Sequence, residues 1–162
     1  MEGYTIKVKQ TNDYELIAKL NKPVHDLHCA LYPERFNTYN FEEMQVLFKE
    51  LMYNDAFIFL VIYDQEEAVG YAWIEIRNYP ENPLIKGYHS IYVHQLSVVA
   101  WKRKQGYGTE LLRYIEELAK ERNIDVVELD YWVDNLVARH FYQKHHFTKK
   151  REFVYKKIDG YA

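Results

Sequence analysis

The sequence has one cysteine in 162 residues, so no disulfide can form within the chain. We expect Cys29 to be a reduced thiol, which fits a cytosolic setting. No apolar stretch approaches the roughly 18 to 20 residues that cross a membrane. The first eight residues also lack the apolar core of a signal peptide. We therefore predict a cytoplasmic protein with no membrane segment.

A large excess of charge is missing as well. Lys and Arg total 21 and Asp and Glu total 24, which gives a net charge of −3 and argues against a general nucleic-acid-binding protein. The six glycines and four prolines form no linker. With 48% hydrophobic and 28% charged residues, the composition is typical of a globular protein. We predict one domain over residues 1–162.

The spacing of apolar residues predicts alternating strands and helices. Residues 56–63 form an almost unbroken apolar run, typical of a buried strand, and residues 68–77 return as its hairpin partner. The expected strands cover residues 4–9, 56–63, 68–77, 90–99, 126–133 and 147–157. The expected helices cover residues 12–20, 23–32, 40–51, 106–121 and 135–145, with Pro23 separating the first two. Strand, helix and strand over 90–133 predict a parallel pair with a right-handed crossover.

Residues 96–112, LSVVAWKRKQGYGTELL, carry the strongest functional signal. They form an apolar strand, a short basic loop and an amphipathic helix, with Arg103, Gly106 and Gly108 in the order R-x-x-G-x-G. The first N–H groups of a helix lack partners, and the helix dipole favours an anion there. Glycine lets the backbone approach such a ligand closely. The pattern predicts a site for a pyrophosphate or for a larger ligand that carries one.

Two other phosphate-binding motifs are excluded. A Walker loop requires G-x-x-x-x-G-K-[ST], which the sequence does not contain. The dinucleotide fingerprint requires three glycines in an N-terminal βαβ unit, whereas this loop has two glycines and lies late in the chain.

A second, independent pattern occupies residues 128–147, ELDYWVDNLVARHFYQKHHF. A strand is followed by Asn135, Ala138, Phe141-Tyr142 and a helix end at Phe147. Together the two segments resemble the GNAT N-acetyltransferase superfamily, and the resemblance covers roughly residues 57–157.

One position in this second pattern departs from the family. His146 stands where the family usually has a glycine in a left-handed conformation, which a histidine tolerates less well. We therefore expect the end of this helix to be strained or built differently.

The resemblance implies a mixed α/β (α+β) fold. Its twisted sheet is mostly antiparallel and has helices on both faces, and one parallel βαβ pair is splayed at a β-bulge. The sequence carries a sign of such a bulge, because the apolar phase slips by one between Ile91–Val93 and Leu96–Val98. Either an extra residue lies near His94–Gln95, or the strand is buried on both faces and its phase carries little information.

The resemblance also implies direct transfer of an acetyl group from acetyl-CoA to an amine. The backbone N–H of Val98 matches the family position that stabilises the thioester oxyanion. Tyr142 matches the general acid that protonates the departing thiolate, and a phenol is protonated at neutral pH. The general base is open: His94 has the most suitable ordinary pKa, and Glu75 or a water relay are alternatives.

For the co-substrate, the loop amides should hold the pyrophosphate, and Asn135 should contact the pantetheine arm or cap its own helix. No metal is expected. The predicted acetyl-CoA contacts are Leu96, Val98, Arg103, Lys104, Gln105, Gly106, Tyr107, Gly108, Thr109, Asn135, Ala138, Tyr142 and Lys144.

We expect a small-molecule amine as the acceptor, with His28, Tyr32 and Phe36 as candidate wall residues. A protein N-terminus or lysine is an alternative acceptor. A non-catalytic acyl-CoA-binding module and an unrelated phosphate-binding α/β domain are alternative functions. A homodimer is possible, since dimers are common in the family.

Overall fold

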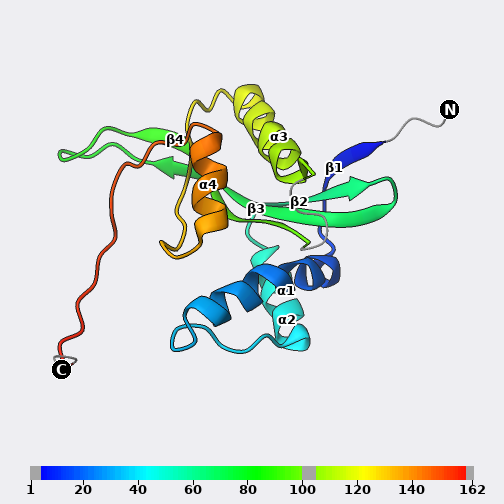
Figure 1. Ribbon diagram of the computed structural model, residues 1–162. Helices are drawn as coiled ribbons and strands as arrows, with labels where there is room; N and C mark the ends of the chain where they lie inside the picture. The colour runs from blue at the N-terminus through cyan, green and yellow to red at the C-terminus, as the bar shows by residue number, and fades with distance from the viewer. Residues whose placement is uncertain (1–4, 100–104, 160–162) are drawn as a thin grey trace. The chain divides into compact units, whose positions relative to one another are not determined.

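A computed structural model describes residues 5–99 and 105–159 (Figure 1). It divides into two compact units, residues 1–130 and 131–162. The first unit holds the whole sheet and three helices, and the second holds one helix and the C-terminal segment.

The sheet of the first unit has five strands in the order β1-β2-β3-β4-β5. All neighbours are antiparallel except β4 and β5, which are parallel and follow one another through helix α3. The mixed, mostly antiparallel sheet that the family resemblance implied is confirmed. The strands are β1 (Ile6–Gln10), β2 (Phe57–Asp64), β3 (Glu67–Tyr79), β4 (Tyr88–Val98) and β5 (Val127–Leu129).

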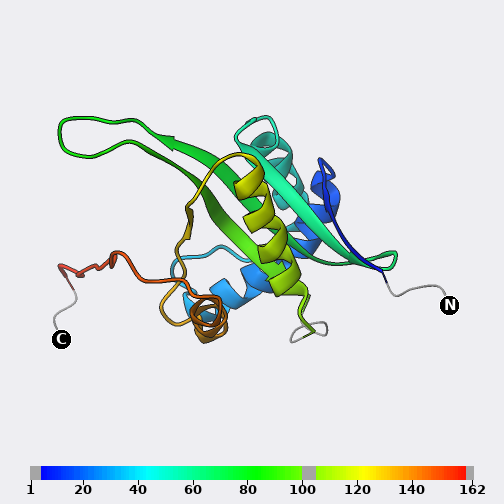
Figure 2. The same ribbon diagram turned by 90° about the horizontal axis from the view of Figure 1, so that it is seen from above.

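Helices cover both faces of this sheet, with α3 (Tyr107–Glu121) on one side and α1 (Tyr14–Leu31) and α2 (Phe41–Leu51) on the other (Figures 1 and 2). α1 starts where the Asp13 carboxylate accepts a hydrogen bond from the N–H of Leu16. The prediction that Pro23 separates two helices was wrong, because α1 continues through it. Proline removes one backbone donor, and packing of the helix on the sheet outweighs that loss.

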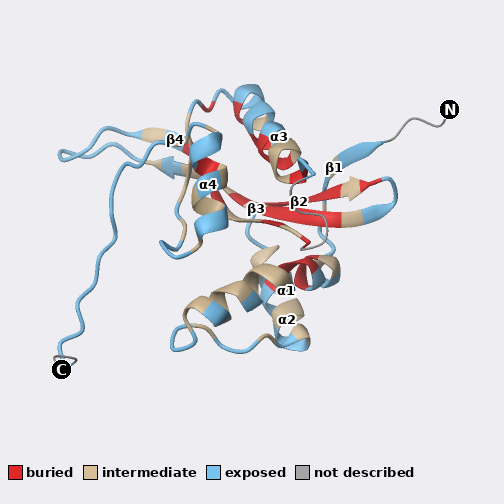
Figure 3. Cartoon of the chain, in the orientation of Figure 1, coloured by how far each residue is buried: buried red, intermediate tan, exposed pale blue. Residues whose placement is uncertain are grey.

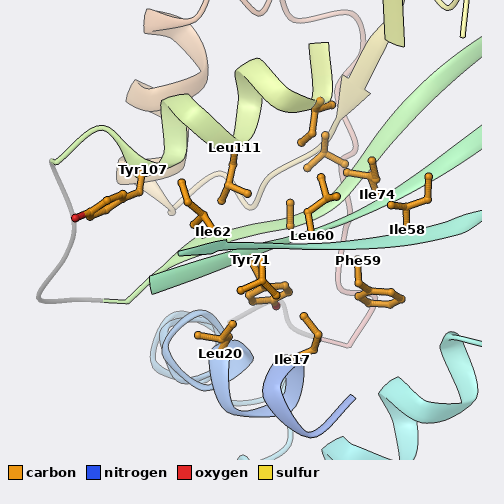
Figure 4. Close-up of a cluster of buried hydrophobic side chains, with 14 of the residues drawn as sticks. Ile17, Leu20, Ile58, Phe59, Leu60, Ile62, Tyr71, Ile74, Tyr107 and Leu111 are labelled. Atoms are coloured by element: carbon orange, nitrogen blue, oxygen red, sulfur yellow. The ribbon is translucent and has the colours of Figure 1, made fainter. Parts of the chain in front are cut away.

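The core explains why the apolar run of β2 has no polar alternation. Ile58, Leu60 and Ile62 point toward α3, and Phe59 points toward the α1 side (Figure 4). Burial is concentrated on the sheet and on the sheet-facing sides of α1 and α3 (Figure 3). Each fully buried leucine or isoleucine stabilises the fold by roughly 1.5–3 kcal/mol relative to exposure. The site therefore rests on a sheet that is packed from both sides.

A β-bulge interrupts β4 where the apolar phase slips. Trp73 of β3 pairs with Gln95, but the next residue, Ile74, pairs with Val93, so His94 is the extra residue. The bulge predicted near His94–Gln95 is confirmed. The pairing of β4 with β5 covers Ile91 to Val93 and ends directly before the bulge.

The second unit contains α4 (Leu136–Lys144), which begins at Asn135. At its other end, the N–H of His146 donates to the carbonyl of Gln143 (3.1 Å) and the N–H of Phe147 donates to that of Tyr142 (3.0 Å). These two bonds form a Schellman motif, whose left-handed position is His146 with φ +67°. The strained helix end expected from the sequence is confirmed.

Two predicted strands differ from the structure. The strand expected over residues 126–133 is limited to β5, which is three residues long. The strand expected over 147–157 is not formed, because these residues have no regular hydrogen-bonded partner strand. Their alternating apolar residues, such as Phe153 and Tyr155, are exposed instead.

Candidate active site

The N-terminus of α3 is open. Gly106 is its N-cap residue and has φ +84°, the left-handed conformation that glycine adopts without strain. Within the described part of the chain this end has no side-chain cap, and the N-terminus of a helix favours an anion. Gln105 and Gly106 precede the helix and Gly108 and Thr109 lie in its first turn. The predicted contacts Arg103 and Lys104 lie outside the described residues.

Tyr107 contributes to this end only through its backbone. Its ring is 1% exposed, and its hydroxyl donates to the carboxylate of Asp64 at the end of β2. The side chain therefore anchors the start of α3 to the sheet, and a ligand could reach only the amide.

The bulge reverses the direction of the N–H groups along β4. Before it, the N–H of Ile91 donates to Val126 on the β5 side (3.0 Å). After it, the N–H of Val99 donates to Val69 of β3 (2.9 Å). Because N–H groups alternate along a strand, those of Leu96 and Val98 point away from β3, toward the side on which the pairing with β5 has ended. Among the described residues, these two predicted contacts therefore have no partner strand on the side to which their N–H groups point.

His94, the bulged residue, is enclosed by aromatic rings. Its imidazole is stacked on Trp73 at 4.4 Å between centroids, and the edges of Phe57 and Tyr92 lie at 5.4 Å and 4.8 Å. The side chain is 20% exposed. Burial lowers the pKa of His94 below its ordinary value, although the carboxylate of Glu75 opposes this effect. The imidazole is therefore neutral at pH 7 and can accept a proton.

Charged and polar groups continue from His94 across the sheet. Nε2 of His94 lies 3.2 Å from the carboxylate of Glu75, which also accepts a hydrogen bond from Arg77. The guanidinium of Arg77 lies 3.8 Å from the ring centroid of Tyr92. The hydroxyl of Tyr92 donates to Asp130 at 2.5 Å. The bulge thus places His94 at one end of a chain of contacts, in which ion pairs and hydrogen bonds are joined by the cation–π contact of Arg77 with Tyr92.

In the second unit, Asn135 caps its own helix. Its side-chain oxygen accepts a hydrogen bond from the N–H of Ala138 at 3.1 Å, which is one of the two roles predicted for it. Lys144 ends the same helix and is exposed.

Tyr142 is buried on α4. Its ring is stacked on Tyr131 at 6.0 Å and meets the edge of Phe147 at 5.4 Å. Burial raises the pKa of Tyr142 above its ordinary value, so the phenol is protonated over the whole physiological range. Such a group can donate a proton or a hydrogen bond to a ligand.

The sequence alone missed part of this arrangement. Trp73 and Phe57 enclose His94, and Arg77 holds Glu75, although none of the three belongs to a recognisable motif. The signal that could have found them is the strand register, since Glu75 is paired with Tyr92 across β3 and β4. That register depends on the bulge, whose exact residue the apolar pattern did not fix.

Two kinds of feature do not occur in the part of the chain that the structure describes. None of its helices is long and apolar enough to cross a membrane. No group of three or more His, Cys, Asp or Glu side chains in residues 5–99 and 105–159 is arranged to hold a metal ion.

The model of the acetyltransferase (GNAT) family matches residues 21–147 of this sequence. This match includes α2, the bulged strand, the open helix end and Tyr142. No curated protein is similar enough in sequence to match the chain.

Solved structures share the fold over nearly the whole chain. A Bacillus halodurans protein, determined as a tetramutant, has a TM-score of 0.86 at 22% identity, with 95% of this chain and 99% of that chain covered. An aminoglycoside N-acetyltransferase in complex with CoA has a TM-score of 0.69 at 16% identity, with 97% of both chains covered. An aminoglycoside acetyltransferase from an uncultured soil sample, in complex with trehalose, has a TM-score of 0.65 at 18% identity, with 94% of this chain and 95% of that chain covered.

Proposed function

Because the chain belongs to the acetyltransferase (GNAT) family, we propose that it moves an acetyl group from acetyl-CoA directly to a primary amine. The family match supports acyl transfer in general, and the acetyl donor and the amine acceptor are our proposal. The observation that carries it is the bulge at His94, which turns the N–H groups of Leu96 and Val98 away from β3, beside a neutral imidazole.

The residues present fit CoA as a substrate. The first turn of α3, from Gly106 to Thr109, suits a pyrophosphate, since a helix N-terminus offers both N–H donors and a favourable dipole. Arg103 and Lys104 would add positive charge to that loop. The N–H groups of Leu96 and Val98 suit the polar groups of the pantetheine arm and the thioester oxygen. Asn135, Ala138 and Lys144 complete the proposed contact set.

The proposed reaction needs one base and one acid. His94 takes a proton from the amine, whose nitrogen forms a bond to the carbonyl carbon of the thioester. The carbon–sulfur bond then breaks, and Tyr142 gives its phenolic proton to the sulfur. The oxyanion formed between these events is stabilised by the N–H of Val98. The lowered pKa keeps His94 neutral and the raised pKa keeps Tyr142 protonated at neutral pH, which are the forms that these assignments require.

We propose a small molecule as the acceptor. The enclosing rings of Phe57, Trp73 and Tyr92 around His94 suit a compact amine better than a long peptide. Two solved structures with the same fold are aminoglycoside acetyltransferases, so aminoglycosides belong among the amines tested. A cytoplasmic location, a single functional domain and a homodimer remain predictions from the sequence.

The test is release of free CoA thiol from acetyl-CoA in the presence of separate amines, with mass spectrometry of each product. The panel should contain polyamines, amino acids, aminoglycosides, and peptides with free N-termini or lysines. Turnover with one class and an acetylated product would support the proposal. Binding of acetyl-CoA without turnover on any amine would instead support a non-catalytic acyl-CoA-binding module.

A further inference from the structure

We propose that Glu75 is a positioning residue for His94, and that its carboxylate, held by Arg77, leaves Nδ1 of the imidazole as the basic atom. This inference rests on the proposed function, because it concerns the residue that takes the proton from the amine. It assigns separate roles to the preferred base from the sequence, His94, and to its alternative, Glu75.

The contacts of Glu75 argue against its acting as the base itself. Its Oε2 atom lies 3.2 Å from Nε2 of His94 and also accepts a hydrogen bond from Nε of Arg77. The Glu75 side chain is only 18% exposed. The Oε2 oxygen already has two partners, the imidazole and the guanidinium, so it is not directed at an incoming amine. It is well suited to accept the N–H of an imidazole.

Arg77 is itself held in place, so the carboxylate has a fixed position. Its guanidinium lies over the ring of Tyr92 at 3.8 Å, and its NH1 group donates to the hydroxyl of Tyr79 at 3.2 Å. Tyr92 in turn donates to Asp130. Each member of this set has a partner on a neighbouring strand or on the same strand. The Glu75 carboxylate therefore cannot turn toward an incoming amine without breaking an ion pair.

The tautomer of His94 follows from this geometry. A carboxylate accepts only, so Nε2 must carry the hydrogen, and the lone pair of a neutral ring is then on Nδ1. Stacking on Trp73 with an interplanar angle of 16°, and the edges of Phe57 and Tyr92, restrict rotation of the ring. No other described residue is hydrogen-bonded to His94. Nδ1 is therefore the atom that remains for the amine proton.

Charges around His94 act in both directions. Burial lowers its pKa, Glu75 raises it, Arg77 lowers it and Asp130 raises it. Once His94 has taken a proton, the imidazolium faces the Glu75 carboxylate, which stabilises it until the proton leaves to solvent. Glu75 thus has two effects that can be separated: it orients the ring, and it keeps the pKa of His94 from falling further.

The experiment compares Glu75→Gln, Glu75→Asp and Arg77→Gln with the wild-type chain. ¹⁵N NMR of the histidine rings reports the tautomer and the pKa of His94 without any substrate. The pH profile of kcat/KM reports the same group in the free enzyme, through its effect on activity. We expect the Nε2–H tautomer in the wild type. Glu75→Gln should lower the pKa of His94 and reduce kcat at least about tenfold, with the KM for acetyl-CoA within about twofold.

One other variant should shift the pKa of His94 in the opposite direction, and two more serve as controls. Arg77→Gln should raise the pKa of His94, because it removes the positive charge that lowers it. Glu75→Asp keeps the charge and should recover part of kcat, which also guards against a Gln variant that fails to fold. Glu66→Gln, in the exposed turn between β2 and β3, is the matched control and should change neither readout.

An Nδ1–H tautomer of His94 in the wild type would overturn the proposal. So would Glu75→Gln if it left either the pKa of His94 or kcat unchanged. Failure of the proposed function has a different signature. In that case no amine is acetylated, while NMR still shows the Nε2–H tautomer of His94 and the lower pKa of His94 in Glu75→Gln.

Discussion

Helices α3 and α4 both follow a β-strand or its extension, yet they begin in opposite ways. α3 starts at a left-handed glycine with no side-chain cap, whereas the Asn135 side chain closes the first turn of α4. A cap satisfies an amide that a ligand could otherwise use, so a closed end favours stability and an open end favours anion binding. We therefore expect the two helices to act differently: α3 would bind a ligand through its backbone, and α4 would contribute side chains such as Tyr142.

The largest effect should come from closing the open end with a charge. Gly106→Asp should weaken acetyl-CoA binding by about 1,000-fold, because losing two charge-assisted hydrogen bonds of roughly 2 kcal/mol each gives a factor of that order. Among the described residues a Cβ at Gly106 meets no atom within 4 Å, but a side chain at φ +84° strains the backbone, so the stability of the variant is measured alongside. Isothermal titration with acetyl-CoA measures the change.

Gly106→Asn is the matched control for this variant. Asparagine has nearly the same size and tolerates positive φ, but it carries no charge. We expect its affinity to lie between those of the wild type and Gly106→Asp. Equal affinities for wild type and Gly106→Asp would remove the open end of α3 as the pyrophosphate site.

The next effect concerns the side chain that α4 contributes. Tyr142→Phe should lower kcat by about 100-fold and leave acetyl-CoA affinity within about twofold, since it removes only the transferable proton. Because burial raises the pKa of Tyr142, deprotonation of the phenol should cause no loss of rate up to at least pH 10. Steady-state kinetics over pH 6 to 10 measure kcat and its pH dependence, and isothermal titration measures the affinity for acetyl-CoA. An unchanged kcat would exclude Tyr142 as the acid.

The closed end of α4 should respond in stability. Asn135→Ala removes the acceptor for the N–H of Ala138 and should reduce the free energy of unfolding by about 1 kcal/mol. Asn135→Ser keeps a capping oxygen and should recover most of this loss. Urea denaturation measures both variants. If Asn135→Ser matches the wild type in stability but binds acetyl-CoA far more weakly, Asn135 contacts the ligand as well as capping its helix.

The smallest effect should be a gain at the other end of α4. His146→Gly should stabilise the protein by up to about 1 kcal/mol, because glycine relieves the cost of φ +67° and pays part of that gain in unfolded-state entropy. The neighbouring His145 has φ −91°, so His145→Gly should destabilise. Equal changes for both variants in urea denaturation would contradict the strain at His146.

The sequence predicted the features that depend on local chemistry. The phase slip located the bulge to within a residue, and the glycine pattern located the start of α3. The departure at His146 correctly predicted strain at a helix end. Each of these follows from neighbours in the chain, which a single sequence displays directly.

What the sequence did not predict depends on tertiary packing. Pro23 separates helices in isolation, but burial of Ile17, Leu20 and Asn21 on one face keeps α1 continuous. The role of Glu75 also could not be resolved from the sequence. Its contact with His94 exists only because β3 and β4 pair in one register and the bulge turns the imidazole toward it.

The most direct test of the contrast between the two helix ends is an NMR titration of the backbone amides with acetyl-CoA. We predict the largest shifts at Gly106 to Thr109, in the first turn of α3, and at Leu96 and Val98, after the bulge. We predict a smaller shift at Ala138, whose N–H is already bonded to Asn135. Large shifts at Ala138 with none at Gly106 to Thr109 would contradict the account.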